Sequence, residues 1–167
     1  MRWFADAKLL RGAMATIRVQ REDFDASAEA AALARGRRDV GAVVSFVGLC
    51  RDEGGRLAAL ELEHYPGMAE AEIARVAAEA EARWPLLGVT AIHRVGRIAP
   101  GEQIVLVAVA AAHRGEAFAA AEMLMDFLKT RAPFWKRVIR ADGVAEGWVE
   151  ANEADEAQAA RWGAAER

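Results

Sequence analysis

One uninterrupted apolar segment constrains the fold of this chain more than any other feature. It is Ile104-Val105-Leu106-Val107-Ala108-Val109-Ala110-Ala111-Ala112, nine residues without a polar side chain. The side chains of a strand alternate between two faces, so an all-apolar strand is stable only when both faces are covered. We therefore predict a central strand here, with other elements of the chain packed on each side of it.

Alternation, turn residues and capping residues predict the elements around this strand. Further strands are expected at 15–20, 40–50, 57–65, 89–98 and 134–139, and helices near 26–36, 67–84, 116–131 and 152–162. The segment 40–50 is rich in β-branched residues and is predicted to be largely buried. A turn signal at 52–55, Asp-Glu-Gly-Gly, separates it from 57–65, so we expect these two strands to form a hairpin. The pattern indicates an α+β fold, with a single domain over 15–167 after an N-terminal extension at 1–14.

Two helices carry apolar stripes that predict which side faces the core. Residues at i, i+3 and i+4 lie on one side of a helix, so a repeat at this spacing marks the buried face. In the helix at 67–84 the stripe is Ile73, Val76, Ala77, Ala80 and Trp84. In the helix at 116–131 the expected stripe is Phe118, Ala121, Met125 and Leu128.

Charge and composition exclude several classes of function. The formal net charge is −3, so no overall basic field draws the chain to nucleic acid or to an anionic membrane. No apolar stretch of roughly 18 residues is present to span a bilayer. The single cysteine, Cys50, fits a reducing, cytoplasmic location. The three histidines lack the paired spacing of a zinc site and no glycine-rich nucleotide motif occurs, so we expect neither a metal nor an organic cofactor.

The strongest candidate for chemistry is the segment 129–136, Lys-Thr-Arg-Ala-Pro-Phe-Trp-Lys. Of 22 Lys and Arg residues only three are lysines, and two of these, Lys129 and Lys136, flank one proline-centred turn. A lysine, unlike an arginine, can lose its proton when it is desolvated or crowded by other cations. The alternative is that both are solvated, with Lys129 in the last turn of a helix and paired with Asp126 three residues earlier.

Strand ends supply further cations. Arg51 follows the predicted strand at 40–50, and His113-Arg114 follows the central strand directly before a helix start, where backbone N–H groups bind anions. If these ends meet the two lysines, they form a cleft for a phosphate-bearing small molecule, in which a lysine can act as general acid or base. Alternatively, His113 only ends a strand and Arg114 is solvated. Cys50, beside Arg51, is either a nucleophile activated by a cation or a small buried hydrophobe.

Several segments together carry a family resemblance that covers roughly residues 15 to 162. The most specific is Asp126-Phe-Leu-Lys-Thr-Arg-Ala-Pro-Phe-Trp-Lys136. Shorter matching segments are Gly41–Gly48 with Arg51, Leu62–Met68, Ile92–Gly96, Ala112–Arg114 and Trp148–Glu150. On these segments the chain resembles the large, catalytic subunits of molybdopterin synthase.

The resemblance implies a fold, an activity and partners. The fold would be an α/β hammerhead with an additional antiparallel β-sheet, and the chain would form a central homodimer. A small ubiquitin-like sulfur-carrier subunit would dock at each end, giving a heterotetramer. The C-terminal Gly-Gly thiocarboxylate of this carrier would enter the active site and donate sulfur to cyclic pyranopterin monophosphate. Two such transfers would form the dithiolene of molybdopterin.

The resemblance also implies roles for individual residues. Lys129 and Lys136 would be catalytic. The substrate-binding residues, which line the site by backbone or side chain, would be Leu49, Cys50, Arg51, His113, Arg114, Arg137 and Val138. Two positions depart from the family pattern: Cys50 stands where valine is usual, and Asn152 stands where many members have arginine, which leaves the role of that arginine open in this chain.

The two lysines are expected to act differently. We expect Lys136 to contact the thiocarboxylate or the phosphate as a cation, and Lys129 to transfer protons or to form a transient covalent bond. Two other functions stay open on the sequence. The chain could be a non-catalytic anion-binding or scaffold subunit whose lysines dock an acidic partner tail. It could also be a lyase that forms a Schiff base on a desolvated lysine, which no other feature of the sequence favours.

Overall fold

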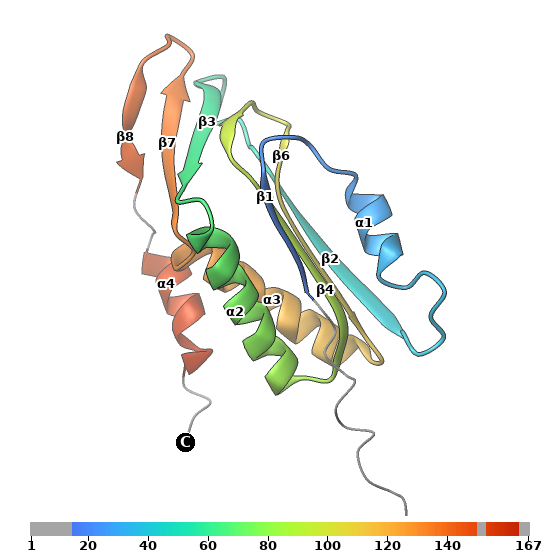
Figure 1. Ribbon diagram of the computed structural model, residues 1–167. Helices are drawn as coiled ribbons and strands as arrows, with labels where there is room; N and C mark the ends of the chain where they lie inside the picture. The colour runs from blue at the N-terminus through green and yellow to red at the C-terminus, as the bar shows by residue number, and fades with distance from the viewer. Residues whose placement is uncertain (1–14, 150–152, 164–167) are drawn as a thin grey trace, which may run out of the picture.

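The computed structural model describes residues 15–149 and 153–163 of the chain, which form two β-sheets and their helices (Figure 1). The strands are β1 (Thr16–Gln20), β2 (Ala42–Leu49), β3 (Leu57–His64), β4 (Leu86–Arg94), β5 (Gly96–Ile98), β6 (Gln103–Ala111), β7 (Phe134–Arg140) and β8 (Ala145–Val149). The helices are α1 (Ala26–Ala32), α2 (Met68–Arg83), α3 (Arg114–Thr130) and α4 (Glu153–Ala160). None of the helices in these ranges is long and apolar enough to cross a membrane. The predicted extension at 1–14 and Asn152 lie outside the described residues.

The apolar segment forms β6, which lies inside the first sheet. The strand order is β1-β4-β6-β2, with β6 antiparallel to both neighbours and β1 parallel to β4. Helices α2 and α3 pack on one face of this sheet and α1 on the other (Figure 1). Every residue of β6 from Val105 to Ala111 is buried. The predicted central strand, covered on both faces, is confirmed.

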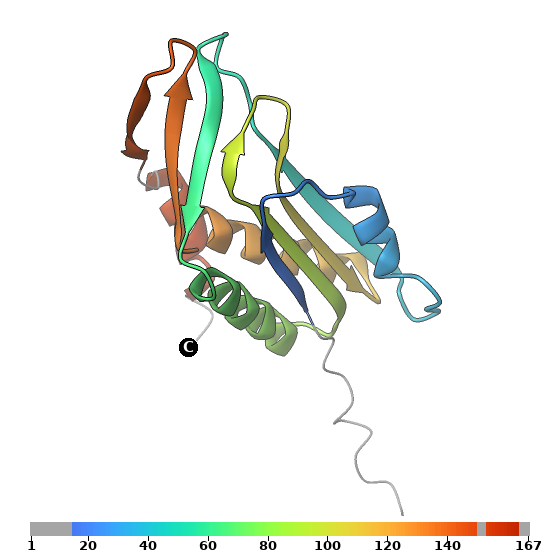
Figure 2. The ribbon, with the colours of Figure 1, turned by 45° about the horizontal axis from the view of Figure 1, so that its top comes forward.

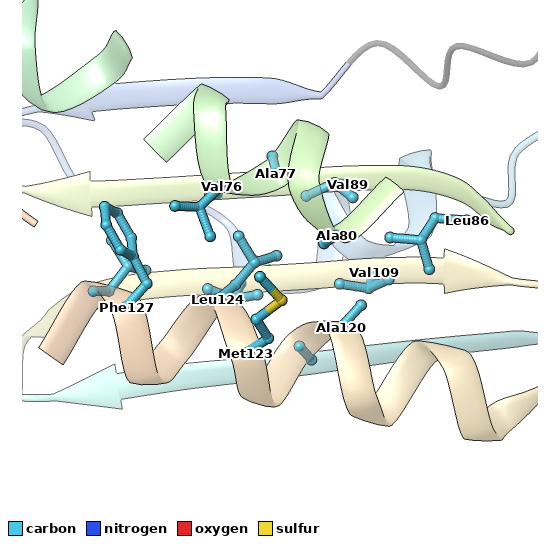
Figure 3. Close-up of a cluster of buried hydrophobic side chains, with 14 of the residues drawn as sticks. Val76, Ala77, Ala80, Leu86, Val89, Val109, Ala120, Met123, Leu124 and Phe127 are labelled. Atoms are coloured by element: carbon cyan, nitrogen blue, oxygen red, sulfur yellow. The ribbon is translucent and has the colours of Figure 1, made fainter. Parts of the chain in front are cut away.

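The main hydrophobic core lies between the first sheet and helices α2 and α3 (Figure 3). Alanines on the inner faces of both helices let their backbones approach the strands, and larger side chains fill the remaining space. The core includes Val76, Ala77 and Ala80 of α2, Val89 of β4, Val109 of β6, and Ala120, Met123, Leu124 and Phe127 of α3. This packing holds α3 along the sheet and so fixes where its last turn ends.

A second sheet stands beside the first (Figure 2). Its order is β5-β3-β7-β8, and every neighbouring pair is antiparallel. A small core of Cys50, Leu62 and Ile98 joins the sheets where the chain leaves β2. The mixture of helices and strands, with an additional antiparallel sheet, confirms the predicted α+β architecture.

The predicted hairpin of 40–50 with 57–65 is wrong. β2 pairs with β6 in the first sheet, whereas β3 pairs with β5 and β7 in the second. The glycine-containing segment after β2 therefore connects two sheets, because a turn signal marks a change of direction and not the partner of a strand. The expected burial is wrong as well. β2 is an edge strand, and Val43, Phe46 and Leu49 are 37%, 43% and 55% exposed.

The predicted strand at 89–98 is divided between the two sheets. β4 ends at Arg94 and pairs with β1 and β6, while β5 begins at Gly96 and pairs with β3. Gly96 has a φ of 86°, a conformation that is strained for residues with a side chain. The change of direction between the sheets therefore depends on this glycine.

The apolar stripe of α3 differs in part from the prediction, whereas that of α2 agrees with it. Ala121 and Leu128 are buried as expected, but Phe118 is 61% exposed and Met125 is only partly buried. The buried face also includes Ala117, Ala120, Met123, Leu124 and Phe127. Helix α3 has apolar residues on more than one side, so spacing alone did not select the face that meets the sheet.

Candidate active site at the junction of the two sheets

The proline-centred turn links the end of α3 to the start of β7. The backbone N–H groups of Arg131 and Ala132 donate to the Phe127 carbonyl at 2.8 and 3.1 Å, which closes the helix. Pro133 disfavours a helical conformation at the residue before it, so the chain extends and β7 begins at Phe134. Lys129 therefore lies in the last turn of α3 and Lys136 in the following strand, as predicted from the sequence.

Lys136 lies on the face of the second sheet that meets the first. It pairs across the strands with Leu62, which packs against Cys50 at the end of β2. Burial raises the pKa of the Cys50 thiol, and the nearby charge of Lys136 opposes this rise only in part. The thiol is therefore neutral, which favours the interpretation of Cys50 as a small buried hydrophobe over that of a nucleophile.

Lys129 approaches the same junction from α3. The His93 ring of β4 stacks on Phe134, with ring centroids 3.9 Å apart and an interplanar angle of 14°. Burial lowers the pKa of His93 to about 4, and the charges of His64 and Lys129 act in the same direction. His93 thus joins the two sheets beside the turn that separates the two lysines.

Neither lysine has a carboxylate partner among the residues that the structure describes. The expected alternative for Lys129 was an ion pair with Asp126, but no pair within 4.0 Å is formed. The Asp126 carboxylate instead accepts hydrogen bonds from Trp162 Nε1 at 2.6 Å and from Arg161 at 2.9 Å. Lys129 is exposed and Lys136 partly buried, so the single chain by itself does not desolvate Lys129.

The end of β2 supplies a further cation near these lysines. The backbone N–H of Cys50 donates to Glu102 at 2.8 Å and its carbonyl accepts from Gly101 at 2.7 Å, which fixes the strand end against the turn before β6. Arg51 follows with a side chain that is 86% exposed and lies 3.9 Å from Glu53. Leu49 is also exposed. The backbone of this strand end is held in place while the Arg51 guanidinium faces solvent.

Arg137 and Val138 lie on opposite faces of β7. Val138 shares the inner face with Lys136, opposite Leu60 of β3. Arg137 points to the other face, where Nε lies 2.6 Å from the Glu61 carboxylate and the guanidinium stands 5.0 Å from the centre of the Trp148 ring. The side chain of Arg137 is thus engaged away from Lys136, and its backbone is the part that lies beside the junction.

His113 and Arg114 lie at the opposite end of the first sheet. The register of β2 and β6 places Leu49 opposite Gln103 and Ala42 opposite Ala111, so His113-Arg114 follows the far end of β6. The two groups of cations are separated by the length of this strand, on the order of 25–30 Å. Both residues are exposed beside an open hollow of about 670 Å³ that Gly41, Ala112, Gly115 and Glu116 also line. Within one chain, the predicted single cleft is therefore divided into two sites.

Sequence reasoning did not single out the contacts of His93 or Asp126. His93 stands in the buried strand β4, and a histidine within an apolar strand is a signal that could have marked it. The partners of Asp126 lie 35 and 36 residues further along the chain. Local spacing gave no sign of them.

Comparison with known proteins places these observations in a family. A family model described as "MoaE protein" matches residues 19–131. A molybdopterin synthase catalytic subunit of Mesorhizobium japonicum is 68% identical over 147 residues, which cover 88% of this chain and 92% of that protein. The solved structure of a molybdopterin biosynthesis MoaE protein from Burkholderia ambifaria is 53% identical, with a TM-score of 0.76, covering 90% of this chain and 99% of that one. The crystal structure of molybdopterin synthase from Staphylococcus aureus matches at 30% identity and a TM-score of 0.69, covering 77% and 95%.

Proposed function

The chain belongs to the MoaE protein family, and we propose on that premise that it is the catalytic subunit of a molybdopterin synthase. It transfers sulfur from the C-terminal thiocarboxylate of a small ubiquitin-like carrier subunit to cyclic pyranopterin monophosphate. Two such transfers complete the dithiolene of molybdopterin. Its single cysteine, a buried neutral thiol, fits an enzyme that works in the cytoplasm.

The observation that carries this proposal is the pair of lysines at the junction of the two sheets. Neither Lys129 nor Lys136 has a carboxylate within ion-pair distance in the described chain, so both ammonium groups are available to anionic ligands. The thiocarboxylate and the pterin phosphate are both anions, and a fixed cation stabilises negative charge that develops during acyl-sulfur chemistry. Lys136 binds one of these anions, while Lys129 transfers the proton or forms the transient covalent bond.

A second copy of the chain completes the site. His113 and Arg114 are too far from the lysines to bind the same small substrate within one protomer. Among the described strands, the outer edge of β2 has no partner, and β2 carries the exposed apolar side chains Val43, Phe46 and Leu49. Antiparallel pairing of this edge with the same edge of a second copy brings the Ala42 end of one strand beside the Leu49 end of the other. The His113-Arg114 pair of one protomer then lies near the Arg51 and lysines of its partner.

Substitution of Lys129 tests the catalytic part of the proposal. In a sulfur-transfer assay with thiocarboxylated carrier, Lys129→Ala is expected to lower turnover by at least about 100-fold, because a proton-transfer group contributes on the order of 10²–10⁴ in rate. Lys129→Arg keeps the charge but cannot release a proton near neutral pH, so it is expected to be similarly impaired. Full activity of Lys129→Arg would reduce the role of this residue to charge alone.

The carrier-binding measurement separates catalysis from docking. If the lysines only docked an acidic tail, Lys129→Ala would weaken the binding of the carrier in proportion to the loss of turnover. The proposal instead predicts that Lys129→Ala binds the carrier with nearly unchanged affinity, measured by calorimetry, while turnover is lost. Trapping with borohydride in the presence of the pterin substrate checks for a Schiff base at the same residue.

A further inference from the structure

Helix α4 and the residues after it contact α3 one turn before Lys129. Asp126 Oδ2 accepts hydrogen bonds from Trp162 Nε1 at 2.6 Å and from Arg161 at 2.9 Å, and the Asp126 side chain is only 16% exposed. Arg161 also forms an ion pair with Glu122 at 2.6 Å. Its guanidinium lies 4.8 Å from the centre of the Trp162 ring. Two neighbouring residues thus satisfy a carboxylate that stands next to the candidate catalytic lysine.

The Asp126 carboxylate is placed on α3 where it could form an ion pair with Lys129. Asp126 and Lys129 are three residues apart, and side chains at this spacing on a helix are neighbours that form ion pairs. The pair is not formed here, and the Asp126 carboxylate is bonded instead to Arg161 and Trp162, which follow α4. A lysine paired with a carboxylate is already neutralised and holds its proton more tightly. It is therefore a poorer ligand for an anionic substrate and a poorer proton donor.

We propose that Arg161 and Trp162 are positioning residues for sulfur transfer, which hold the Asp126 carboxylate away from Lys129 and keep that ammonium available. The proposal rests on the function of Lys129 proposed above. It assigns to the C-terminal part of the chain a role in the reaction beyond packing. Packing alone would be served by the edge-to-face contact of Trp162 with Trp84, whose ring centroids are 5.8 Å apart.

The double variant Trp162→Phe with Arg161→Met removes the two donors and keeps an aromatic ring against Trp84. Measured in the complete complex with carrier at low ionic strength, its turnover at neutral pH is expected to fall by a factor of about 1.5 to 2, the size of an i,i+3 ion pair on a helix. Its pH optimum is expected to move upward by a few tenths of a unit, since the pair holds the lysine protonated. Added salt screens an exposed pair, so about 0.5 M salt should restore most of the turnover.

A third substitution, Asp126→Asn in the double-variant background, provides the rescue. Asparagine cannot form the ion pair with Lys129, so turnover and pH optimum are expected to return to wild-type values. Trp84→Phe is the matched control, because it changes the same aromatic contact without touching Asp126. Its turnover is expected to stay unchanged apart from any loss of thermal stability.

The outcomes separate this inference from the proposed function. A loss that Asp126→Asn does not rescue, or that Trp84→Phe reproduces, would show that the C-terminal segment acts only in packing. Unchanged turnover of the double variant would also overturn the inference. In both cases Lys129→Ala still decides the proposed function: if that variant is inactive, only the role of Arg161 and Trp162 fails.

Discussion

At the scale of single residues, His93 is a buried histidine whose protonation affects the stability of the fold. Its ring is buried between the sheets and stacked on Phe134, and its Nδ1 lies 2.8 Å from the Arg94 carbonyl. Burial lowers its pKa from 6.5 to about 4 in the fold. The neutral ring is therefore part of the packing that fixes the start of β7, two residues before Lys136.

This histidine makes the folded state sensitive to acid. Between pH 6.5 and about 4 the unfolded chain binds a proton at His93 and the folded chain does not, so stability is lost as the pH falls through this window. The loss is expected to reach about 3 kcal/mol, from roughly 1.4 kcal/mol for each unit of pKa difference. Chemical denaturation at several pH values measures it.

Two variants identify the residue responsible. His93→Asn keeps a donor for the Arg94 carbonyl but loses the stacking on Phe134, so its free energy of unfolding is expected to be lower at pH 7. Because asparagine does not titrate, this free energy is expected to change less between pH 6.5 and 4. His113→Asn changes an exposed histidine and should keep the slope of the wild type. An unchanged slope in His93→Asn would show that His93 is not the group that titrates.

At the scale of single elements, α3 buries one of its apolar faces and exposes another. Leu124 is fully buried in the main core (Figure 3). Phe118 on the same helix is 61% exposed. Leu124→Ala is expected to lower the free energy of unfolding by about 2–5 kcal/mol, because it leaves a cavity in a close-packed core. Thermal and urea denaturation of the monodisperse protein measure the difference.

Phe118→Ala is the matched control for that helix. The substitution removes a larger side chain, but one that is mostly in contact with solvent, so the expected change in an isolated chain is below about 1 kcal/mol. If Phe118→Ala lowered the free energy of unfolding as much as Leu124→Ala does, Phe118 would have to be buried in solution. The assignment of a single buried face to α3 would then be wrong.

Helices and strands that depend on a local residue pattern could be predicted from the sequence, whereas the pairing of strands could not. The apolar run of β6 and the inner face of α2 agree with their local patterns. The pairing of β2 with β6 joins segments about 60 residues apart, and alternation within 40–50 carries no information about that partner. The division of 89–98 at Gly96 depends on a second sheet that is not visible in the local pattern.

The candidate site shows the same limit. The turn at Pro133 and its two lysines could be placed from sequence, because capping and the effect of proline act over a few residues. The separation of Arg114 from Lys129 follows from the antiparallel register of β2 and β6 and from the direction of α3. That arrangement is set by tertiary packing, and it turns one predicted cleft into two groups of cations.

At the scale of the whole molecule, the proposed active site spans two copies of the chain. Arg51 follows the end of β2 at one end of the first sheet, near Lys136 and Lys129, and His113-Arg114 lies at the other end. A two-fold axis beside the edge strand β2 would create two identical sites, each with lysines from one protomer and Arg114 from its partner. This arrangement explains why a small molecule could meet all of these cations.

Activity of a mixed dimer tests this central claim most directly. Lys129→Ala and Arg114→Ala are each expected to be nearly inactive as homodimers. A heterodimer with one chain of each kind, purified through two different affinity tags, contains one site with both residues intact and one site that lacks both. We therefore predict that it recovers about half of the wild-type rate of sulfur transfer. If each site is built within one chain, no intact site exists in the heterodimer, and a rate no higher than that of the two inactive parents would contradict the account.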